Sequence, residues 1–299
     1  MSMEIKYLYT GSTPIKLKTF LTQQGISRRL LAKIKYAGGD LLVNGISHNV
    51  LVTLMPQTEV KIIFPPEKNR KEELIASYVP LDILYEDRDF LIVNKPAKVA
   101  SIPSILHPAD SLINRVYGYY KMRDYDDIIP HIVTRLDRDT SGLVLFAKHR
   151  YAHALLNEQL KNKQVIKKYL ALVHGHVSYT QLDIKAPIAR CADSTMKREV
   201  SPNGQFAHTS LKVKQIFADT TLLELQLHTG RTHQIRVHCA HLGYPLVGDD
   251  LYGGKIQMPI QRQALHCYKL IFYHPFKQQM LAFDAKLPSD MLSFLQHQS

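Results

Sequence analysis

The chain has 299 residues, 45% of them hydrophobic, which is enough for one large domain or two smaller ones with a sizeable core. Its net charge of +12 favours a polyanionic partner, with nucleic acid as the first candidate. Three widely separated cysteines argue against a disulfide framework and a thiolate zinc site, and no apolar run approaches the roughly 18–20 residues that cross a membrane. Because the N-terminus has no secretory signal, we expect a soluble cytoplasmic protein without a membrane partner.

Two short helices are predicted near the start of the chain, within a first domain of residues 1–66. The first helix ends at Gly25, where glycine permits the backbone to turn away. Ser27 is a suitable N-cap for the second helix, which stops at Gly38. This pattern predicts a small α+β unit.

A hairpin is predicted directly after these helices. The apolar strand 41–43 is followed by Asn44-Gly45, a strong signal for a type I′ turn. Residues 59–64 supply a closing strand. The charged segment that follows two prolines predicts a linker over residues 67–80.

Basic residues dominate the two predicted helices. No acidic residue occurs between Glu4 and Asp40, and Arg29 and Lys33 lie four positions apart on one helix face, next to Arg28. Such a stripe is typical of phosphate binding, although it can equally be a solvated helix face. Two helices and a hairpin with a Ser-Arg-Arg start and a Val-Asn-Gly end resemble the S4 RNA-binding domain, which implies that these basic side chains contact RNA.

The segment 81–299 is predicted to form a second, antiparallel-rich α+β domain, because tight turns join most of its strands and a few helices lie between them. It has no glycine-rich nucleotide-binding motif and no internal repeat. The expected strands span residues 83–85, 90–94, 143–147, 169–173, 209–217 and 221–227, and the expected helices span residues 151–160 and 232–242.

A carboxylate between two arginines begins the most informative segment, residues 135–148. Asp137 is flanked by Arg135 and Arg138, and a Thr-Ser-Gly turn and a buried strand follow. Fixed cations favour the ionised carboxylate, which suits attack on, or stabilisation of, an electron-poor centre in a phosphate-bearing substrate. The alternative is an ordinary surface turn before a core strand.

Three further motifs accompany this segment: Asn-Lys-Pro at 94–96, Lys-Lys-Tyr at the entrance of the strand within 167–175, and two arginines within 230–238. In this order and spacing the four motifs resemble the RluA-type RNA pseudouridine synthases, which isomerise uridine to pseudouridine in ribosomal or transfer RNA. The resemblance covers residues 81–284. It implies the pseudouridine synthase fold, a mixed, mostly antiparallel bent sheet with flanking helices.

The resemblance implies a role for each of five residues. Asp137 would attack the ribose C1′ or stabilise the charge that forms there, and Arg236 would pair with its carboxylate. Tyr169 would stack on the uracil and assist proton removal from C5. Arg135 would fill the gap that the flipped uridine leaves in the RNA, and Arg231 would line the site or contact a phosphate.

The expected substrate is 23S ribosomal RNA, since an S4 domain commonly accompanies the family members that act on it; transfer RNA is the second candidate. We expect a monomer that needs no cofactor and no metal, because isomerisation involves no redox change. The family usually has histidine before the Arg-Leu-Asp triplet, whereas this chain has Thr134 there and His131 three residues earlier. Since that histidine is not the nucleophile, we expect activity to survive with altered loop anchoring or RNA contacts.

A histidine-rich segment invites a metal site as an alternative. Its members are His228, His233, His238 and His241, with Cys239 among them. On a helix their spacing matches a shared ligand face poorly, so core or RNA-facing histidines are expected instead.

Three other interpretations stay open at this point. Ser141 lacks the motif of a nucleophile elbow, which favours a turn role. A glycosidase needs a second carboxylate, and Asp139, if on a strand, would point the same way as Asp137 and lie too close for inversion. A non-catalytic RNA-binding or ribosome-assembly protein would use the same basic surfaces, but binding alone does not require an acid in a basic cleft.

Tyr169 taken alone is an ordinary packing tyrosine, and only the company of Asp137 and Arg236 favours a catalytic role.

Overall fold

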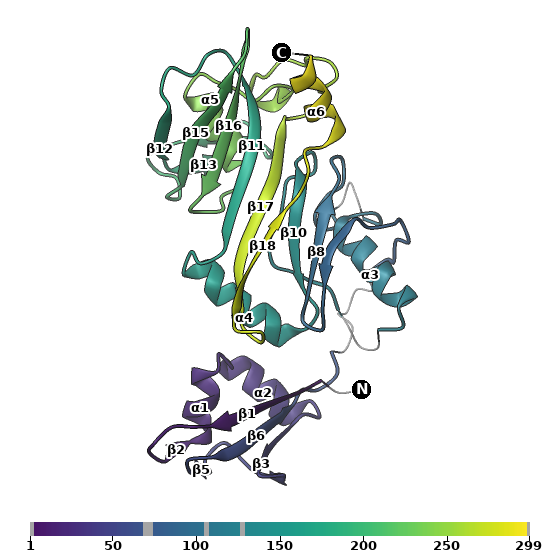
Figure 1. Cartoon of the computed structure of the whole chain (residues 1–299), viewed down its shortest axis with the longest axis vertical. Helices are drawn as coiled ribbons and strands as arrows, with labels where there is room; N and C mark the ends of the chain where they lie inside the picture. Colours follow the sequence, from purple (N-terminus) through teal and green to yellow (C-terminus); the bar gives the residue numbers. More distant parts are fainter. Residues whose placement is uncertain (1–2, 68–73, 105–107, 126–128, 298–299) are drawn as a thin grey trace.

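The computed structural model describes residues 3–67, 74–104, 108–125 and 129–297. It contains two main sheets, each with its own apolar core: a small one near the N-terminus and a large one formed by the rest of the chain (Figure 1). Residues 68–73 of the predicted linker lie outside the described residues. Within the described ranges, no helix is both long and apolar enough to cross a membrane.

The small sheet is antiparallel, with strand order β1-β6-β3-β4, and two helices share its core. Alternate residues of the central strand β6, such as Val60 and Ile62, are fully buried against Leu21 and Ile34 of the helices. The elements are β1 (Glu4–Tyr9), β2 (Ile15–Lys16), α1 (Leu17–Gln23), α2 (Arg28–Tyr36), β3 (Asp40–Val43), β4 (Ile46–Ser47), β5 (Thr53–Leu54) and β6 (Thr58–Ile63).

The local signals in this part of the sequence are confirmed. Ser27 caps α2, where its Oγ accepts a hydrogen bond from Leu30 N at 3.2 Å. Asn44 and Gly45 adopt positive φ angles of 47° and 85°, as a type I′ turn between β3 and β4 requires. Strand β1 was not predicted from the sequence, because only its long-range pairing with β6 identifies it.

The large sheet has ten strands in the order β12-β15-β16-β11-β17-β10-β8-β7, with β18 beside β17 and β9 beside β10. Its pairs are antiparallel except for β10 with β17, which confirms the predicted α+β class with a mixed, mostly antiparallel sheet. The strands are β7 (Ile83–Glu86), β8 (Phe90–Lys95), β9 (His131–Ile132), β10 (Ser141–Ala147), β11 (Ile166–His174), β12 (Gln181–Lys185), β15 (His208–Ile216), β16 (Thr220–Leu227), β17 (Leu265–His274) and β18 (Gln279–Asp284).

Helices and a small hairpin flank the large sheet. They are α3 (Leu112–Met122), α4 (Arg150–Lys161), the hairpin of β13 (Ile188–Arg190) and β14 (Arg198–Val200), α5 (Gln234–His241), the 3₁₀ turn η1 (Asp250–Tyr252) and α6 (Ser289–Gln296). Helices α3 and α6 and the pair β17–β18 were not predicted from the sequence. The helix expected from residue 232 begins at Gln234, because His233 takes a left-handed conformation with φ of 57°.

Helix α4 lies between the large sheet and the small unit (Figure 1), and Tyr151 in its first turn belongs to the small core. Tyr151 is almost fully buried there, its ring stacked on Phe64 at 5.3 Å between centroids. Its hydroxyl donates a hydrogen bond to Gln24 O and lies 2.6 Å from Tyr7 Oη. Tyr151 therefore holds the N-terminal unit to α4 with both apolar and polar contacts, and Leu155 of the same helix also packs against the small core.

We predict that Tyr151→Ala lowers the free energy of unfolding by about 3–5 kcal/mol, the usual cost of deleting a large buried aromatic ring. Tyr151→Phe keeps the stacking on Phe64 and removes only the hydroxyl contacts, so it should cost about 1 kcal/mol. Urea denaturation of both variants measures the difference. Equal effects of the two substitutions would show that the ring does not hold the units together.

Candidate active site

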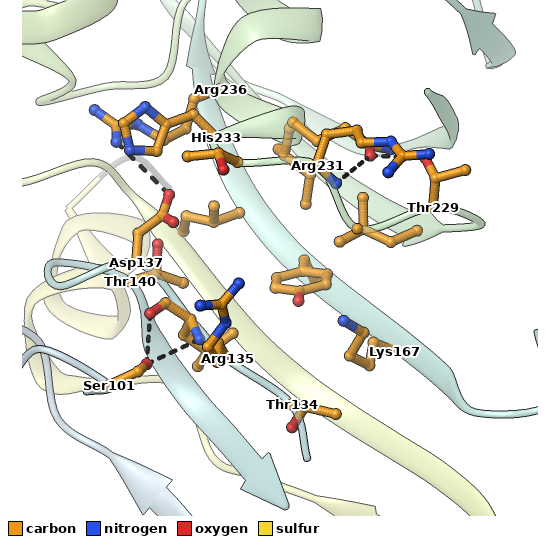
Figure 2. A pocket seen from close by; sticks show the side chains of 18 of the residues that line it. Ser101, Thr134, Arg135, Asp137, Thr140, Lys167, Thr229, Arg231, His233 and Arg236 are labelled. Atoms are coloured by element: carbon orange, nitrogen blue, oxygen red, sulfur yellow. Dashed lines mark hydrogen bonds and ion pairs between the residues drawn. The ribbon is translucent and has the colours of Figure 1, made fainter. Parts of the chain in front are cut away.

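A pocket of about 640 Å³ lies where the ends of several elements of the large sheet meet (Figure 2). Its lining comes from the loop before β10, the start of β11, and the segment that joins β16 to α5. Motifs that are far apart in the sequence therefore meet in one cavity. The predicted site residues that line it are Asp137, Tyr169, Arg236, Arg135 and Arg231.

Hydrogen bonds to neighbouring segments anchor the loop that carries Asp137. Thr134 is buried, and its Oγ1 accepts a hydrogen bond from Leu145 N at 3.0 Å. Ser101 Oγ donates to Leu136 O at 2.6 Å and accepts from Leu136 N at 3.0 Å. Thr134, which stands where the family usually has histidine, thus ties the loop to β10.

Two buried cations hold the loop on the other side of Asp137. Lys95 Nζ donates to the carbonyl of residue 138 at 2.8 Å and to two carbonyls of its own loop, and Arg262 Nη1 donates to the carbonyl of residue 139 at 3.0 Å. Burial lowers the pKa of Lys95 to about 7, while three carbonyl acceptors favour the ammonium form, which has three donors. Anchored on both sides, the backbone directs the Asp137 side chain into the pocket.

Arg236 is shared between two carboxylates. Its Nε and Nη2 each donate to one oxygen of the fully buried Asp249 at 2.7 Å. Its Nη1 lies 3.6 Å from Asp137 Oδ2, and the Asp137 side chain is 28% exposed against 7% for Arg236. Burial opposes the charge of Arg236, but Asp249 and Asp137 outweigh burial and raise the pKa of the guanidinium. The pair with Asp249 therefore fixes the guanidinium, which then faces Asp137.

Tyr169 lies on β11 and is 3% exposed, with its side chain in the wall of the pocket. A β-bulge between Lys168 and Tyr169 interrupts the pairing of β11 with β17 at this point. Burial, followed by nearby Cys267 and Asp137, raises the pKa of Tyr169 well above its usual value. At neutral pH the residue is therefore a neutral phenol with an aromatic face.

Several residues of the site were not identified from the sequence. Lys167 lines the pocket, and burial together with nearby Arg135 lowers its pKa, although Cys267 opposes this. Tyr252 places its ring 4.9 Å from the guanidinium carbon of Arg236, and Asp249 lies just before it in the chain. The Lys-Lys-Tyr motif contained a signal for Lys167, whereas nothing in the sequence linked Asp249 and Tyr252 to α5.

Arg231 lies in the loop before α5, outside the helix, as the expected helix range of 232–242 implies. Gln234 organises this loop: its Oε1 accepts hydrogen bonds from Arg231 N at 3.0 Å and Thr229 Oγ1 at 2.7 Å. Arg231 Nε donates to Phe206 O at 3.0 Å, and the side chain is exposed at the edge of the pocket (Figure 2). The two arginines of this motif consequently face the cavity from a loop and a helix.

The predicted basic stripe lies outside the pocket. Arg28 and Arg29 are exposed on α2, and Lys33 is half-buried beside them. Partial burial lowers the pKa of Lys33, and the nearby charges of Arg150 and Arg29 lower it further. Arg150 is the first residue of α4, so the basic stripe continues onto that helix. Beyond the other end of α4, Lys163 lines the pocket. Helix α4 therefore connects the stripe with the cavity.

The histidines considered as metal ligands are separated in the structure. His238 is buried, with Nδ1 2.9 Å from Thr209 Oγ1 and Nε2 3.0 Å from a backbone carbonyl. His228 lies near His208 and Asp183, and one potential ligand atom from each lies within 4.8 Å of the others. Hydrogen bonds of Ser210 Oγ to Asp183 and His228 already join this group. The arrangement is a hydrogen-bonded network that could also hold a cation.

The structure corrects the expected position of Asp139 and places a histidine beside Ser141. Asp139 lies in a turn and not on a strand, and its carboxylate pairs with Arg138 at 3.0 Å. Ser141 has a potential base, His266 Nδ1 at 2.9 Å, but both side chains are buried and neither lines the pocket. Burial lowers the pKa of His266 to about 4. Ser141 therefore has a structural role at the start of β10.

The two carboxylates on Arg236 should differ in their effect on stability. Asp249→Asn leaves a buried guanidinium without its closest counter-charge, so we predict a loss of about 3–5 kcal/mol in the free energy of unfolding. Asp137→Asn removes a longer and more exposed contact and should cost at most about 1 kcal/mol. Chemical denaturation measures the free energy of unfolding of both variants. A similar decrease for the two would contradict the conclusion that Asp249 is the principal partner of Arg236.

The chain is similar to known proteins over most of its length. Residues 89–241 match the RNA pseudouridylate synthase family. The chain is 46% identical to an RNA pseudouridine synthase of Bacillus subtilis (strain 168), YjbO, over 92% of this chain and 96% of that protein. It is 36% identical to ribosomal large subunit pseudouridine synthase D of Escherichia coli (strain K12), over 73% and 70%. The solved structure of human RNA pseudouridylate synthase domain containing 1 matches with a TM-score of 0.56 and 25% identity, over 74% and 96%. The chain therefore belongs to the RNA pseudouridylate synthase family and is an RNA pseudouridine synthase of the RluA/RluD type.

Proposed function

We propose that this enzyme isomerises specific uridines in structured ribosomal RNA, with Asp137 acting at the reacting carbon. The observation that carries the proposal is the carboxylate of Asp137 held 3.6 Å from Arg236 Nη1, in a cavity that Tyr169 also lines. Relatives named for the large ribosomal subunit support ribosomal RNA as the substrate, with transfer RNA as the second candidate. A ribosomal substrate is consistent with the cytoplasmic location expected from the sequence.

In the proposed reaction the bond between uracil N1 and ribose C1′ breaks, the base turns, and C5 bonds to C1′ while the C5 proton is lost and N1 gains one. No electrons are gained or lost. Cleavage builds positive charge at C1′, which the carboxylate of Asp137 attacks or stabilises. Because Asp249 already neutralises most of the charge on Arg236, the Asp137 carboxylate keeps its charge available for C1′ while Arg236 orients it.

Two further side chains serve the flipped nucleotide. A uridine inside folded RNA must leave its stack, which costs a few kcal/mol, and a planar guanidinium can occupy the vacated place. Arg135 is exposed at the pocket and has no ion-pair or hydrogen-bond partner among the described residues. Tyr169 offers an aromatic face for the uracil, and stacking of this kind contributes about 1–3 kcal/mol per base.

The proposed division of the chain is an S4-like RNA-binding domain at 1–66, a linker at 67–80 and a catalytic domain at 81–299. Support comes from the separate apolar core of the small sheet and from the basic side chains of α2. The continuation of this stripe towards Arg150 and α4 suits an RNA that touches both units. A non-catalytic RNA-binding protein, the alternative function, would use the same surface without turnover.

We predict that Asp137→Asn abolishes pseudouridine formation and leaves RNA affinity nearly intact, because the substitution removes the charge and keeps the shape. Mapping of pseudouridine in RNA incubated with each protein measures turnover, and filter binding measures affinity. Thr140→Ser, a conservative change in the same loop, is the control for folding. Near-normal turnover by Asp137→Asn would refute the assignment, and an inactive wild-type protein would favour the alternative.

The basic stripe gives a separate prediction. Replacement of Arg28, Arg29 and Lys33 by Gln should weaken RNA binding and reduce the slope of log K against log salt by about 0.7–0.9 for each phosphate that is no longer neutralised. The KM for RNA should rise more than kcat falls, since the stripe lies outside the catalytic pocket. Lys121→Gln is a control, because Lys121 is exposed and belongs to α3, which lies beside the large sheet and not in the small unit that contains α2 (Figure 1). An unchanged salt slope would exclude the stripe from RNA binding.

A further inference from the structure

A second hollow, of about 390 Å³, adjoins the candidate active site. It shares Gly230, Arg231 and Thr232 with the catalytic pocket, so the two are neighbouring compartments of one surface. The hairpin of β13 and β14 forms its other wall and contributes Arg190 and Arg198. Three guanidinium groups thus line the hollow, and none of its described lining residues is an aspartate or glutamate.

The hairpin places two of these charges side by side. Arg190 and Arg198 are direct partners across the β13–β14 pair, and like charges opposite one another destabilise a sheet. Within the described chain no carboxylate forms an ion pair with them or with Arg231: Arg198 Nη1 donates to a backbone carbonyl at 3.1 Å, and Arg231 Nε to Phe206 O at 3.0 Å. An anion between the guanidinium groups would relieve this repulsion.

The hairpin is also connected to the residues around Asp137. Tyr252 Oη accepts a hydrogen bond from Arg198 N at 2.9 Å and lies 2.9 Å from His233 Nδ1. The ring of the same tyrosine is 4.9 Å from the guanidinium carbon of Arg236. The backbone of β14 therefore supports the aromatic ring that packs against the catalytic arginine, and a ligand held by the hairpin would stabilise both.

We propose that Arg190, Arg198 and Arg231 form a phosphate-binding subsite that holds the RNA backbone next to the uridine in the catalytic pocket. This proposal rests on the proposed function, because RNA is its ligand. Guanidinium groups match phosphate oxygens in planar, bidentate geometry. The two compartments share a wall. When a uridine occupies the catalytic pocket, a phosphodiester group next to it in the RNA would therefore lie in the hollow.

The test compares Arg190→Gln, Arg198→Gln and the double variant with the wild-type protein. Binding of a fluorescently labelled, uridine-containing RNA stem-loop is measured by anisotropy over a range of KCl concentrations. We expect affinity to fall about threefold to tenfold per arginine near 0.1 M salt, and the slope of log K against log salt to become shallower by about one for each arginine replaced. Arg190→Lys should keep the slope and lose part of the affinity, because lysine keeps the charge but lacks the planar fork.

The matched control is Lys121→Gln, which removes an exposed cation from α3, on the opposite side of the large sheet from the hairpin (Figure 1). Thermal melting of each variant confirms that it is folded. Unchanged affinity and salt slope in the double variant would overturn the subsite. So would an equal loss in Lys121→Gln, because the effect would then reflect total charge alone.

Inorganic phosphate offers the same chemistry as the RNA backbone, and a parallel calorimetric titration separates the two sources. If the double variant loses phosphate binding but retains the RNA affinity of the wild type, the hollow is a free-anion site and the proposal fails. A failure of the proposed function has a different signature, the absence of pseudouridine from wild-type reactions. The subsite is measured by binding, so the two failures are distinguishable.

Discussion

Two buried cations hold consecutive carbonyl groups of the loop that carries Asp137, and the rest of the site depends on this contact. Lys95 binds the first carbonyl of the pair at 138–139, and Arg262 binds the second. Burying a charge is costly unless it is hydrogen-bonded or paired, so each of these cations gains from the loop conformation that supplies one of its acceptors. Arg262 also forms a two-pronged pair with Asp290 of α6. The end of the chain thereby contributes to the geometry of the catalytic loop.

The same principle governs the charges that face the pocket. Asp249 is fully buried and takes both of the short hydrogen bonds of Arg236, while Asp137 receives only the longer contact. A carboxylate with a tight bidentate partner would be a poor nucleophile and a weak stabiliser of positive charge. In the proposed mechanism this division orients Asp137 and leaves its carboxylate free to act at C1′, while the ring of Tyr252 packs against the guanidinium of Arg236.

The two proposed RNA-binding surfaces extend from this centre in two directions. Helix α4 runs from the small core, where Tyr151 is buried, towards Lys163 in the catalytic pocket, so the basic stripe of α2 and the cavity are connected by one rigid element. On the other side, the β13–β14 hairpin adds Arg190 and Arg198 to the cavity edge. Among the described residues that line the pocket, Asp137 is the only aspartate or glutamate. An RNA bound along both surfaces would bring its uridine to this carboxylate.

The sequence by itself determined several caps and turns and the chemistry of the motifs, but not the elements β1, α3, α6, β17 and β18. Ser27 and Asn44-Gly45 act through neighbouring backbone groups, so their cap and turn could be predicted, as could the pocket residues that short motifs identify. Only the tertiary structure decided that Asp249 is the principal partner of Arg236 and that a lysine and an arginine from distant segments fix the catalytic loop. These contacts join separate segments of the chain, and their strength comes from the joint burial of both partners, which no local sequence pattern encodes.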